Sequence, residues 1–134
     1  MQIFIEIREA RGIRTLHFGS DWVQGAMRVS RPWDLELAYT REMMAVLMLS
    51  ADWPDYPRRI LQIGLGAGSL ARFIDRYLPD ADQVVIEESA AVVAAARQGF
   101  NLPPENDRLQ IVVAEGAAWV ANATALFDLI LVDG

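Results

Sequence analysis

Glycines follow an apolar segment of the chain with a spacing that suits a nucleoside ligand. Gly64, Gly66 and Gly68 come directly after the apolar residues 59–63 and form the pattern G-x-G-x-G. Glycines let a backbone turn sharply, and they let a ligand approach the N-terminus of the next helix. Nicotinamide sites use G-x-G-x-x-G, so a dinucleotide fits poorly, whereas the tighter form is typical of S-adenosyl ligands. For this motif alone, a tight turn that binds nothing is the alternative.

Three carboxylates end the apolar segments that follow: Glu87, Glu115 and Asp133. Glu87 could accept hydrogen bonds from both hydroxyls of a ribose, or it could be a solvated residue before a helix, where Glu88 would serve equally well. Glu115 could accept the amino group of an adenine, or favour the N-terminus of the next helix. Together with the glycines, these positions favour a nucleoside-type ligand over a chance arrangement.

The elements that would position these residues alternate between strand and helix from residue 59 onward. We expect strands at 59–63, 83–87, 109–114 and 128–133, with helices at 69–77, 90–99 and 117–125. This alternation predicts a Rossmann-like parallel sheet covered on both faces, with its strands in the order 3-2-1-4. Ligands of such sheets bind beyond the carboxyl ends of the strands, where the glycines and the three carboxylates fall.

The fourth strand of this sheet would have no following element to cover it. Residues 129–132 would lie at a sheet edge, and an uncovered edge favours association with another chain. We therefore expect a truncated domain, or a second chain that supplies the cover.

The residues before 59 have a different pattern. Alternation over residues 2–18 predicts a hairpin about Arg11 and Gly12, and a third strand is expected at 22–29. A helix rich in Met, Leu and Ala is expected at 35–50, followed by a proline-containing loop. The predicted organisation is a small antiparallel β module, a helix with a linker, and a Rossmann-like nucleoside-binding domain, over residues 1–31, 32–58 and 59–134.

Composition narrows the classes of function. The chain has 134 residues, of which 53% are hydrophobic, and a net charge of −6, which describes one acidic globular chain. This charge argues against nucleic-acid binding and is compatible with a small cationic ligand. With no Cys and one His, neither a thiol nucleophile nor a Cys or His metal cluster is expected. No apolar run has the length of a membrane span, and no basic leader precedes the first strand, so a cytoplasmic location is expected.

Further motifs surround the candidate site. They are Asp21-Trp-Val-Gln24, Glu36 to Met43 with Tyr39, Arg59 to Leu70, Arg76 to Pro79, Val85 to Glu87, Val112 to Glu115 and Asp128 to Asp133. On these motifs the chain resembles the spermidine synthase family, the polyamine aminopropyltransferases, over nearly its whole length. The glycine motif is shared with most class I methyltransferases. The β module with Gln24 and the helix with Tyr39 point to this family in particular.

The resemblance implies a class I methyltransferase-type fold and the transfer of an aminopropyl group from decarboxylated S-adenosylmethionine to a polyamine such as putrescine. It implies ribose binding by Glu87, adenine recognition by Glu115, and roles for Gln24 and Tyr39 around the donor chain and the amine. It gives Asp133 the role of binding the attacking amine and helping to deprotonate it, since an amine with a pKa near about 10 is protonated at neutral pH. It implies no permanently bound cofactor, a small cationic amine substrate and a homodimer.

Two departures from the family pattern leave other functions open. Ala67 replaces an Asp of the glycine motif that in the family holds the amino group of the donor, and Ser89 replaces an acidic residue. An S-adenosylmethionine-dependent methyltransferase is one alternative, because an intact methionine tail needs different contacts. A non-catalytic member that binds a nucleoside or a partner chain is the other.

Overall fold

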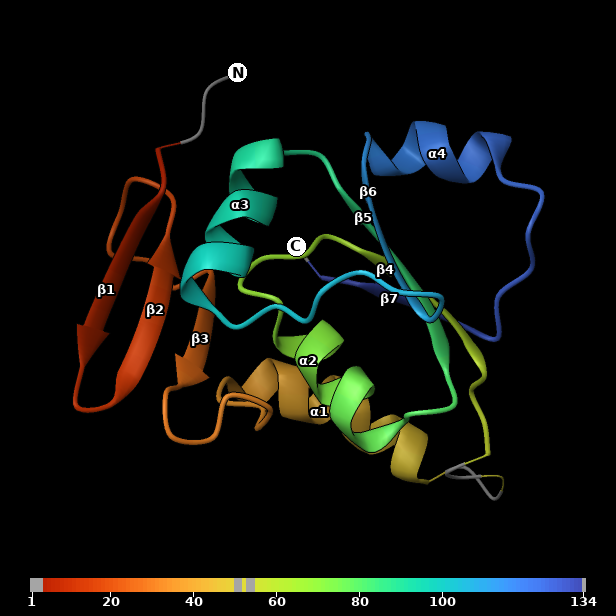
Figure 1. Ribbon diagram of the computed structural model, residues 1–134, viewed down its shortest axis with the longest axis horizontal. Coiled ribbons are helices and arrows are strands. Elements are labelled where there is room, and N and C mark those ends of the chain that lie inside the picture. The colour runs from red at the N-terminus through yellow and green to blue at the C-terminus, as the bar shows by residue number, and fades with distance from the viewer. Residues whose placement is uncertain (1–3, 50–51, 53–54, 134) are drawn as a thin grey trace.

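The computed structural model describes residues 4–49, 52 and 55–133, and it arranges them as two sheets with four helices (Figure 1). The elements follow in the order β1 (Glu6–Ala10), β2 (Ile13–His17), β3 (Gly25–Arg28), α1 (Ala38–Met48), β4 (Arg59–Ile63), α2 (Ser69–Tyr77), β5 (Asp82–Glu87), α3 (Ala90–Gly99), β6 (Leu109–Val113), α4 (Gly116–Asn122) and β7 (Leu129–Val132). Among the described residues, no helix combines the length and the apolar character needed to cross a membrane.

The small sheet is antiparallel in the order β1-β2-β3, as the alternation predicts. Arg11 and Gly12 make the hairpin turn with φ angles of 55° and 78°. The third strand is shorter than expected, because only Gly25–Arg28 pair with β2 and the residues before Gly25 form a loop. The expected start of the first strand, residues 2 and 3, lies outside the described residues.

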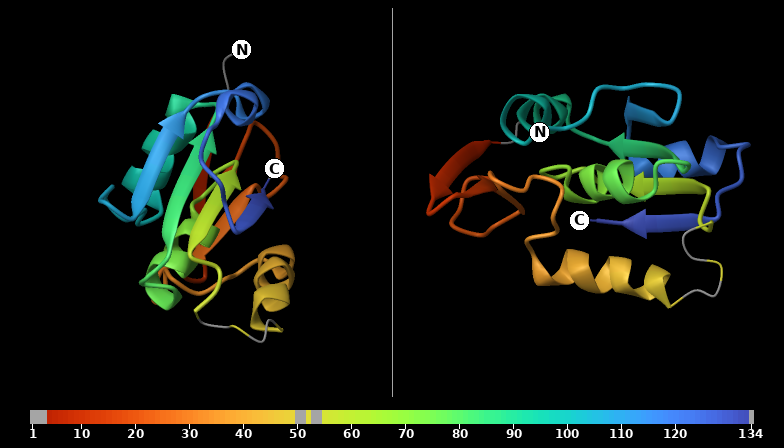
Figure 2. Two further views of the ribbon diagram at one scale, coloured as in Figure 1. Left: turned by 90° about the vertical axis from the view of Figure 1, so that its right-hand side faces the viewer. Right: turned by 60° about the horizontal axis from the view of Figure 1, so that its bottom comes forward.

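The large sheet is parallel in the order β6-β5-β4-β7, which confirms the predicted order of its four strands. In register, Ile63 of β4 pairs with Ile86 of β5 on one side and with Val132 of β7 on the other. The carboxyl ends of these three strands therefore lie next to one another. They point toward the small sheet, which stands at that end of the molecule (Figure 2).

Helices α1, α2 and α3 cover one face of the large sheet. Alternate residues of β4 and its neighbours point to this face and form two apolar clusters with the helices. The cluster beneath α1 and α2 includes Ile60 and Leu131, and the cluster between α2 and α3 includes Val85 and Leu109. These clusters fix the distance of β4 and β7 from the helices, and with it the position of the strand ends.

Helices lie on both faces of the sheet, as predicted, but the cover of the opposite face is uneven among the described residues: Leu61 of β4 and Ile86 of β5 point to that face and are 2% and 1% exposed, whereas the edge strand β7 is open. Of the described helices, α4 is the one on that face, and none of its residues is buried. Ile130 and Val132 of the edge strand β7 keep 54% and 65% of their surface exposed. The expectation that 129–132 form an uncovered sheet edge is confirmed.

Two of the four helices have the predicted bounds, α2 and α3. Helix α1 begins at Ala38 instead of residue 35, because Leu37 is extended with φ −84° and ψ 139°. Helix α4 spans Gly116–Asn122 instead of 117–125, since Ala123 is again extended. The predicted end of the first helix, Ser50, and part of the expected loop at 52–57 lie outside the described residues.

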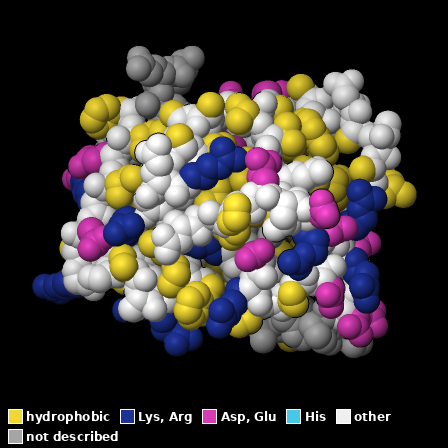
Figure 3. Space-filling model, in the orientation of Figure 1, with side chains coloured by type: hydrophobic (Ala, Val, Ile, Leu, Met, Phe, Trp, Pro, Cys, Tyr) yellow, Lys and Arg dark blue, Asp and Glu magenta, His cyan; other side chains and the backbone are white. Residues whose placement is uncertain are grey.

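Charged side chains of both signs lie interspersed on the face of the molecule in Figure 3. Several arginines pair with nearby carboxylates, for example Arg28 with Glu36 at 2.9 Å and Arg31 with Asp34 at 2.6 Å. On this face the basic residues form no continuous patch of the kind that binds a phosphate backbone.

Candidate active site

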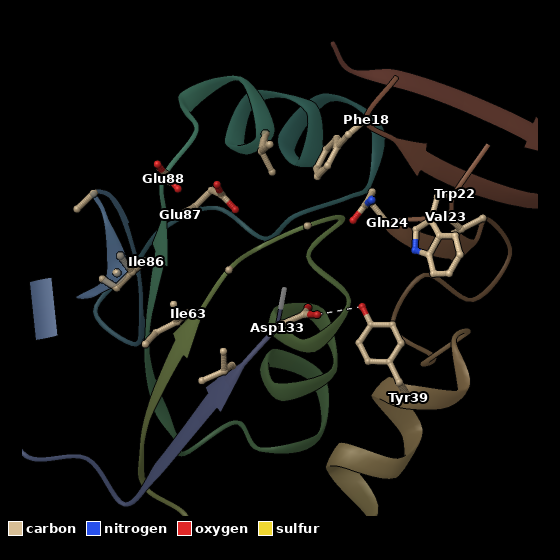
Figure 4. Close-up of a pocket in the computed structure, with 16 residues that line it drawn as sticks. Phe18, Trp22, Val23, Gln24, Tyr39, Ile63, Ile86, Glu87, Glu88 and Asp133 are labelled. Atoms are coloured by element: carbon tan, nitrogen blue, oxygen red, sulfur yellow. Dashed lines mark hydrogen bonds between the residues drawn. The ribbon is translucent and has the colours of Figure 1, made fainter. Parts of the chain in front are cut away.

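A cavity of about 570 Å³ lies between the small sheet and the carboxyl ends of the parallel strands. A volume in this range suits a small organic ligand. Six of the eight predicted site residues line it: Gln24, Tyr39, Gly64, Gly66, Glu87 and Asp133. The sequence motifs, which are far apart along the chain, thus meet around one cavity (Figure 4).

The glycine loop, residues 64–68, turns the chain from β4 into α2. A Cβ atom on Gly64 would overlap the carbonyl oxygen of Asp133, and the φ of Gly64 is 91°. Only glycine therefore lets the loop pass this close to the end of β7. Gly66 lines the cavity, whereas Gly68, with φ 78°, lies behind it as the N-cap residue of α2.

Glu87 is held in place by two backbone amides. The N–H of Leu65 donates to one carboxylate oxygen at 3.0 Å, and the N–H of Ser89 donates to the other at 2.8 Å. A carboxylate has about four lone-pair sites, so each oxygen can accept one further bond. The side chain points into the cavity (Figure 4), where those sites can accept a pair of hydroxyls.

Tyr39 and Asp133 form a side-chain hydrogen bond in the cavity wall, although they lie 94 residues apart in the sequence. The Tyr39 hydroxyl donates to Oδ1 of Asp133 at 2.9 Å (Figure 4). Burial raises the pKa of Asp133, the hydrogen bond from Tyr39 lowers it, and the charge of Glu87 raises it. Burial and the neighbouring charge of Asp133 raise the pKa of Tyr39, so this hydroxyl stays protonated and remains a donor. The pair is therefore a carboxylate with raised basicity, oriented by a fixed donor.

Gln24 approaches the cavity from the loop between β2 and β3. Its backbone N–H donates to Leu16 at 2.8 Å, which anchors the loop to β2, and its side chain points toward the cavity from the side opposite Glu87 (Figure 4). The same loop is tied to the buried His17, whose Nδ1 lies 3.1 Å from the carbonyl oxygen of Trp22.

Sequence reasoning missed several residues of the cavity wall. Phe18, Trp22 and Glu88 also line it, and Trp22 keeps 75% of its surface exposed there. The proximity of Trp22 to Gln24 in the motif was the available signal for this residue. Phe18 ends a predicted strand, which gave no reason to place it near the glycines.

Glu115 lies outside the wall of this cavity, although its neighbours Ala114 and Gly116 belong to it. Its carboxylate accepts hydrogen bonds from Ala117 and Ala118 at 2.9 Å each, and it thus caps the N-terminus of α4. Of the two roles expected for Glu115, the structure shows the helix cap. A contact with adenine stays a prediction.

The described residues contain no group of three or more His, Cys, Asp or Glu side chains that could hold a metal ion. A parallel sheet in this order, with a glycine loop and a carboxylate at the end of the second strand, defines the class of Rossmann-like folds that bind nucleosides at the strand ends. Solved structures agree with this class. Human methyltransferase-like protein 13 in complex with SAH is similar over 73% of this chain and 48% of its own, with 25% identity and a TM-score of 0.63.

Comparison with curated proteins narrows the class to one family. A polyamine aminopropyltransferase of Chromobacterium violaceum is 49% identical over 97% of this chain, and one of Neisseria meningitidis serogroup A is 43% identical over the same share. A probable spermidine synthase from Corynebacterium glutamicum shares the fold over 98% of this chain with a TM-score of 0.79, at 24% identity. No family model matches the chain. The resemblance to the spermidine synthase family is thereby confirmed over almost the whole of this chain.

The chain spans about half the length of the curated relatives that it matches, because the matched region is 48% of each of those two proteins. It also covers 48% of the Corynebacterium structure.

Proposed function

We propose that this chain forms the donor site and the catalytic pair of a polyamine aminopropyltransferase. The reaction would transfer an aminopropyl group from decarboxylated S-adenosylmethionine to an amine such as putrescine. One observation carries the proposal: the Tyr39–Asp133 pair and Glu87 face a single cavity at the glycine loop. The relatives named polyamine aminopropyltransferase support the same reaction.

In this proposal, the nucleoside part of the donor lies along the glycine loop. Glu87 would accept the two ribose hydroxyls with the lone pairs that its backbone amides leave open. Gly64 and Gly66 would let the ligand approach the backbone closely. Gln24 would contact the chain that carries the transferred group. Glu115 would act beside the adenine end, either through the cap of α4 or by direct contact.

The acidic wall suits two cationic substrates. Glu87, Glu88 and Asp133 all line the cavity, and their field favours both a sulfonium donor and a protonated amine. Asp133 would bind the ammonium group, take one of its protons and release the nitrogen lone pair. The amine would then attack the carbon next to sulfur, the carbon–sulfur bond would break, and the electron pair would stay on the sulfur of methylthioadenosine. Because the sulfonium is already activated, orientation of the amine is the main task of the Tyr39–Asp133 pair.

A methyltransferase is the second candidate, and Ala67 favours it. This side chain is 2% exposed and packs on Gly25 of β3, so it offers no polar contact to the donor. The methyltransferase with bound SAH in the comparison supports an S-adenosyl ligand of either kind. The relatives named polyamine aminopropyltransferase favour the first candidate.

The test is a product assay with either donor. The protein is incubated with putrescine and decarboxylated S-adenosylmethionine, or with S-adenosylmethionine, and products are identified by mass spectrometry. Formation of methylthioadenosine and spermidine with the first donor alone supports the proposal. Methyl transfer from the second donor supports the second candidate. If the protein binds ligand but transfers no group to any amine, it is a non-catalytic member of the family that binds a nucleoside.

The proposal includes a homodimer, in which a second copy would cover the apolar surface near β7. Ile130 and Val132 there are exposed. Light scattering on the purified protein should give twice the mass of one chain, and a monomer mass would refute this part.

A further inference from the structure

Arg72 is a buried cation without an acidic partner among the described residues. It lies in the first turns of α2 and is 4% exposed, and none of the ion pairs formed by the described part of the chain includes it. Burial lowers the pKa of Arg72 to about 10, so it still carries its charge at neutral pH. A buried charge is costly unless hydrogen bonds satisfy it, so the contacts of this guanidinium need an explanation.

The guanidinium bonds to three backbone segments that are distant in sequence. Nε donates to the carbonyl oxygen of Pro32 at 2.6 Å. Nη1 donates to the carbonyl oxygens of Ala67 and Phe100, the latter at 2.8 Å. Nη2 donates to the Ser69 hydroxyl at 3.3 Å. Arg72 thus joins the segment after β3, the glycine loop and the end of α3.

These bonds hold the glycine loop at Ala67, and neither Ala67 nor Arg72 lines the ligand cavity. Ala67 is the fourth residue of that loop, and its methyl group packs against Gly25, where even a Cβ atom would be in overlap. One residue earlier, Gly66 lies close to the carbonyl oxygen of Gln24. The position of the Ala67 carbonyl therefore influences the distance between Gly66 and Gln24 at the cavity wall.

Other side chains fix the same loop at separate points. Glu87 accepts from Leu65 at 3.0 Å, and the buried Gln62 donates to the carbonyl oxygen of Gly64 at 2.9 Å. Arg72 alone among these three also reaches outside the large sheet, to Pro32 next to the small sheet. It thereby links the two halves of the cavity wall.

We propose that Arg72 is a positioning residue of the nucleoside site: its guanidinium holds the carbonyl of Ala67, and through it the glycine loop, against the segment that follows β3. Without this side chain, buried carbonyl oxygens of Ala67 and Phe100 lose a charged donor. Ser69 still donates to the carbonyl oxygen of Ala26 in β3 at 3.2 Å, but the loop loses its charged link to the segment after β3, and ligand affinity falls. The affinity part of this inference rests on the proposed function of the cavity.

The test compares three variants by calorimetric titration with methylthioadenosine and by thermal unfolding. Arg72→Met removes every donor, Arg72→Lys keeps a charge and up to three donors, and Ile74→Val trims the core on the same helix without touching the loop. Arg72→Met should weaken affinity by about tenfold to a hundredfold, the range that small misplacements of a site produce. Arg72→Lys should recover part of this loss, and Ile74→Val should change affinity by less than about twofold although it lowers Tm.

The inference would be overturned if Arg72→Met and Ile74→Val lost affinity in the same proportion to their losses in Tm. The role of Arg72 would then be stability alone. Hydrogen–deuterium exchange separates this outcome from failure of the proposed function. If the wild type binds no methylthioadenosine, faster exchange of residues 64–68 in Arg72→Met than in Ile74→Val still supports the positioning role, and equal exchange overturns it. If Arg72→Met does not fold, Arg72→Lys is compared with Ile74→Val in its place.

Discussion

Replacement of Gly64 by Ala should destabilise the protein far more than the same replacement at Gly12. Both glycines have positive φ angles, 91° at Gly64 and 78° at Gly12, so a side chain brings similar backbone strain at either position. Their surroundings differ. A Cβ atom on Gly12 meets nothing within 4 Å, whereas one on Gly64 would overlap the backbone carbonyl of Asp133. Gly12→Ala is therefore a matched control for strain without overlap.

The two costs can be separated in magnitude. Left-handed backbone strain costs about 1–2 kcal/mol for a residue with a Cβ. Overlap in a packed region adds about 1–3 kcal/mol at Gly64, because backbone instead of a flexible side chain must move. Each kcal/mol lowers Tm by about 4 °C in a chain of this length. Gly12→Ala should therefore lower Tm by about 4–8 °C and Gly64→Ala by about 8–20 °C.

Differential scanning calorimetry on the two variants and the wild type measures these shifts. Because the atom that must move belongs to Asp133, Gly64→Ala should also reduce the proposed aminopropyl transfer below the detection limit, while Gly12→Ala keeps the wild-type rate. Equal Tm losses in the two variants would refute the reasoning. They would mean that the glycine loop does not approach the end of β7 as closely as the structure has it.

Three further predictions test the other contacts of the site and its frame. Tyr39→Phe removes the hydrogen bond that lowers the pKa of Asp133, so the acidic limb of the rate–pH profile should move to higher pH; an unmoved limb contradicts the pairing. The backbone amides of Arg58 and Arg59 hold the pKa of Asp128 below its usual value, so this carboxylate stabilises the fold above the unfolded-state pKa and the contribution is lost as pH falls. The Tm difference between the wild type and Asp128→Ala should accordingly be largest near neutral pH and shrink in acid, and a difference that grows in acid contradicts the assignment. Glu115→Ala removes the cap of α4 and should lower the free energy of unfolding, measured with urea, by about 1 kcal/mol. An unchanged free energy of unfolding would mean that this cap does not form in solution.

Local signals in the sequence were sufficient for much of the large sheet. Helices α2 and α3 have the predicted bounds because each begins at a recognisable residue, Gly68 in the left-handed conformation and Ser89 with its side chain accepting from Val92. The order of the parallel strands follows from right-handed crossovers between consecutive elements. These features depend on short stretches of chain, and such stretches can be interpreted without tertiary contacts.

Features that depend on distant contacts could not be predicted in the same way. The partnership of Tyr39 with Asp133 joins α1 to the end of β7, and no spacing in the sequence indicates it. Arg72 was missed because a basic residue on a helix is usually solvated, and its partners are backbone carbonyls that leave no mark on the sequence. The exposure of α4 could not be predicted either, because its sequence does not reveal that none of its residues is buried.

Binding of methylthioadenosine tests the central claim most directly, because this nucleoside is the product that the cavity would release. Isothermal titration calorimetry compares the wild type with Glu87→Gln, which replaces one acceptor oxygen and keeps the size of the side chain. We expect saturable binding at one site per chain, and an affinity at least about tenfold weaker in Glu87→Gln, as for the loss of a hydrogen bond to a charged group. Absence of binding by the folded wild type, or equal affinity in the two proteins, would contradict the assignment of this cavity as a nucleoside site.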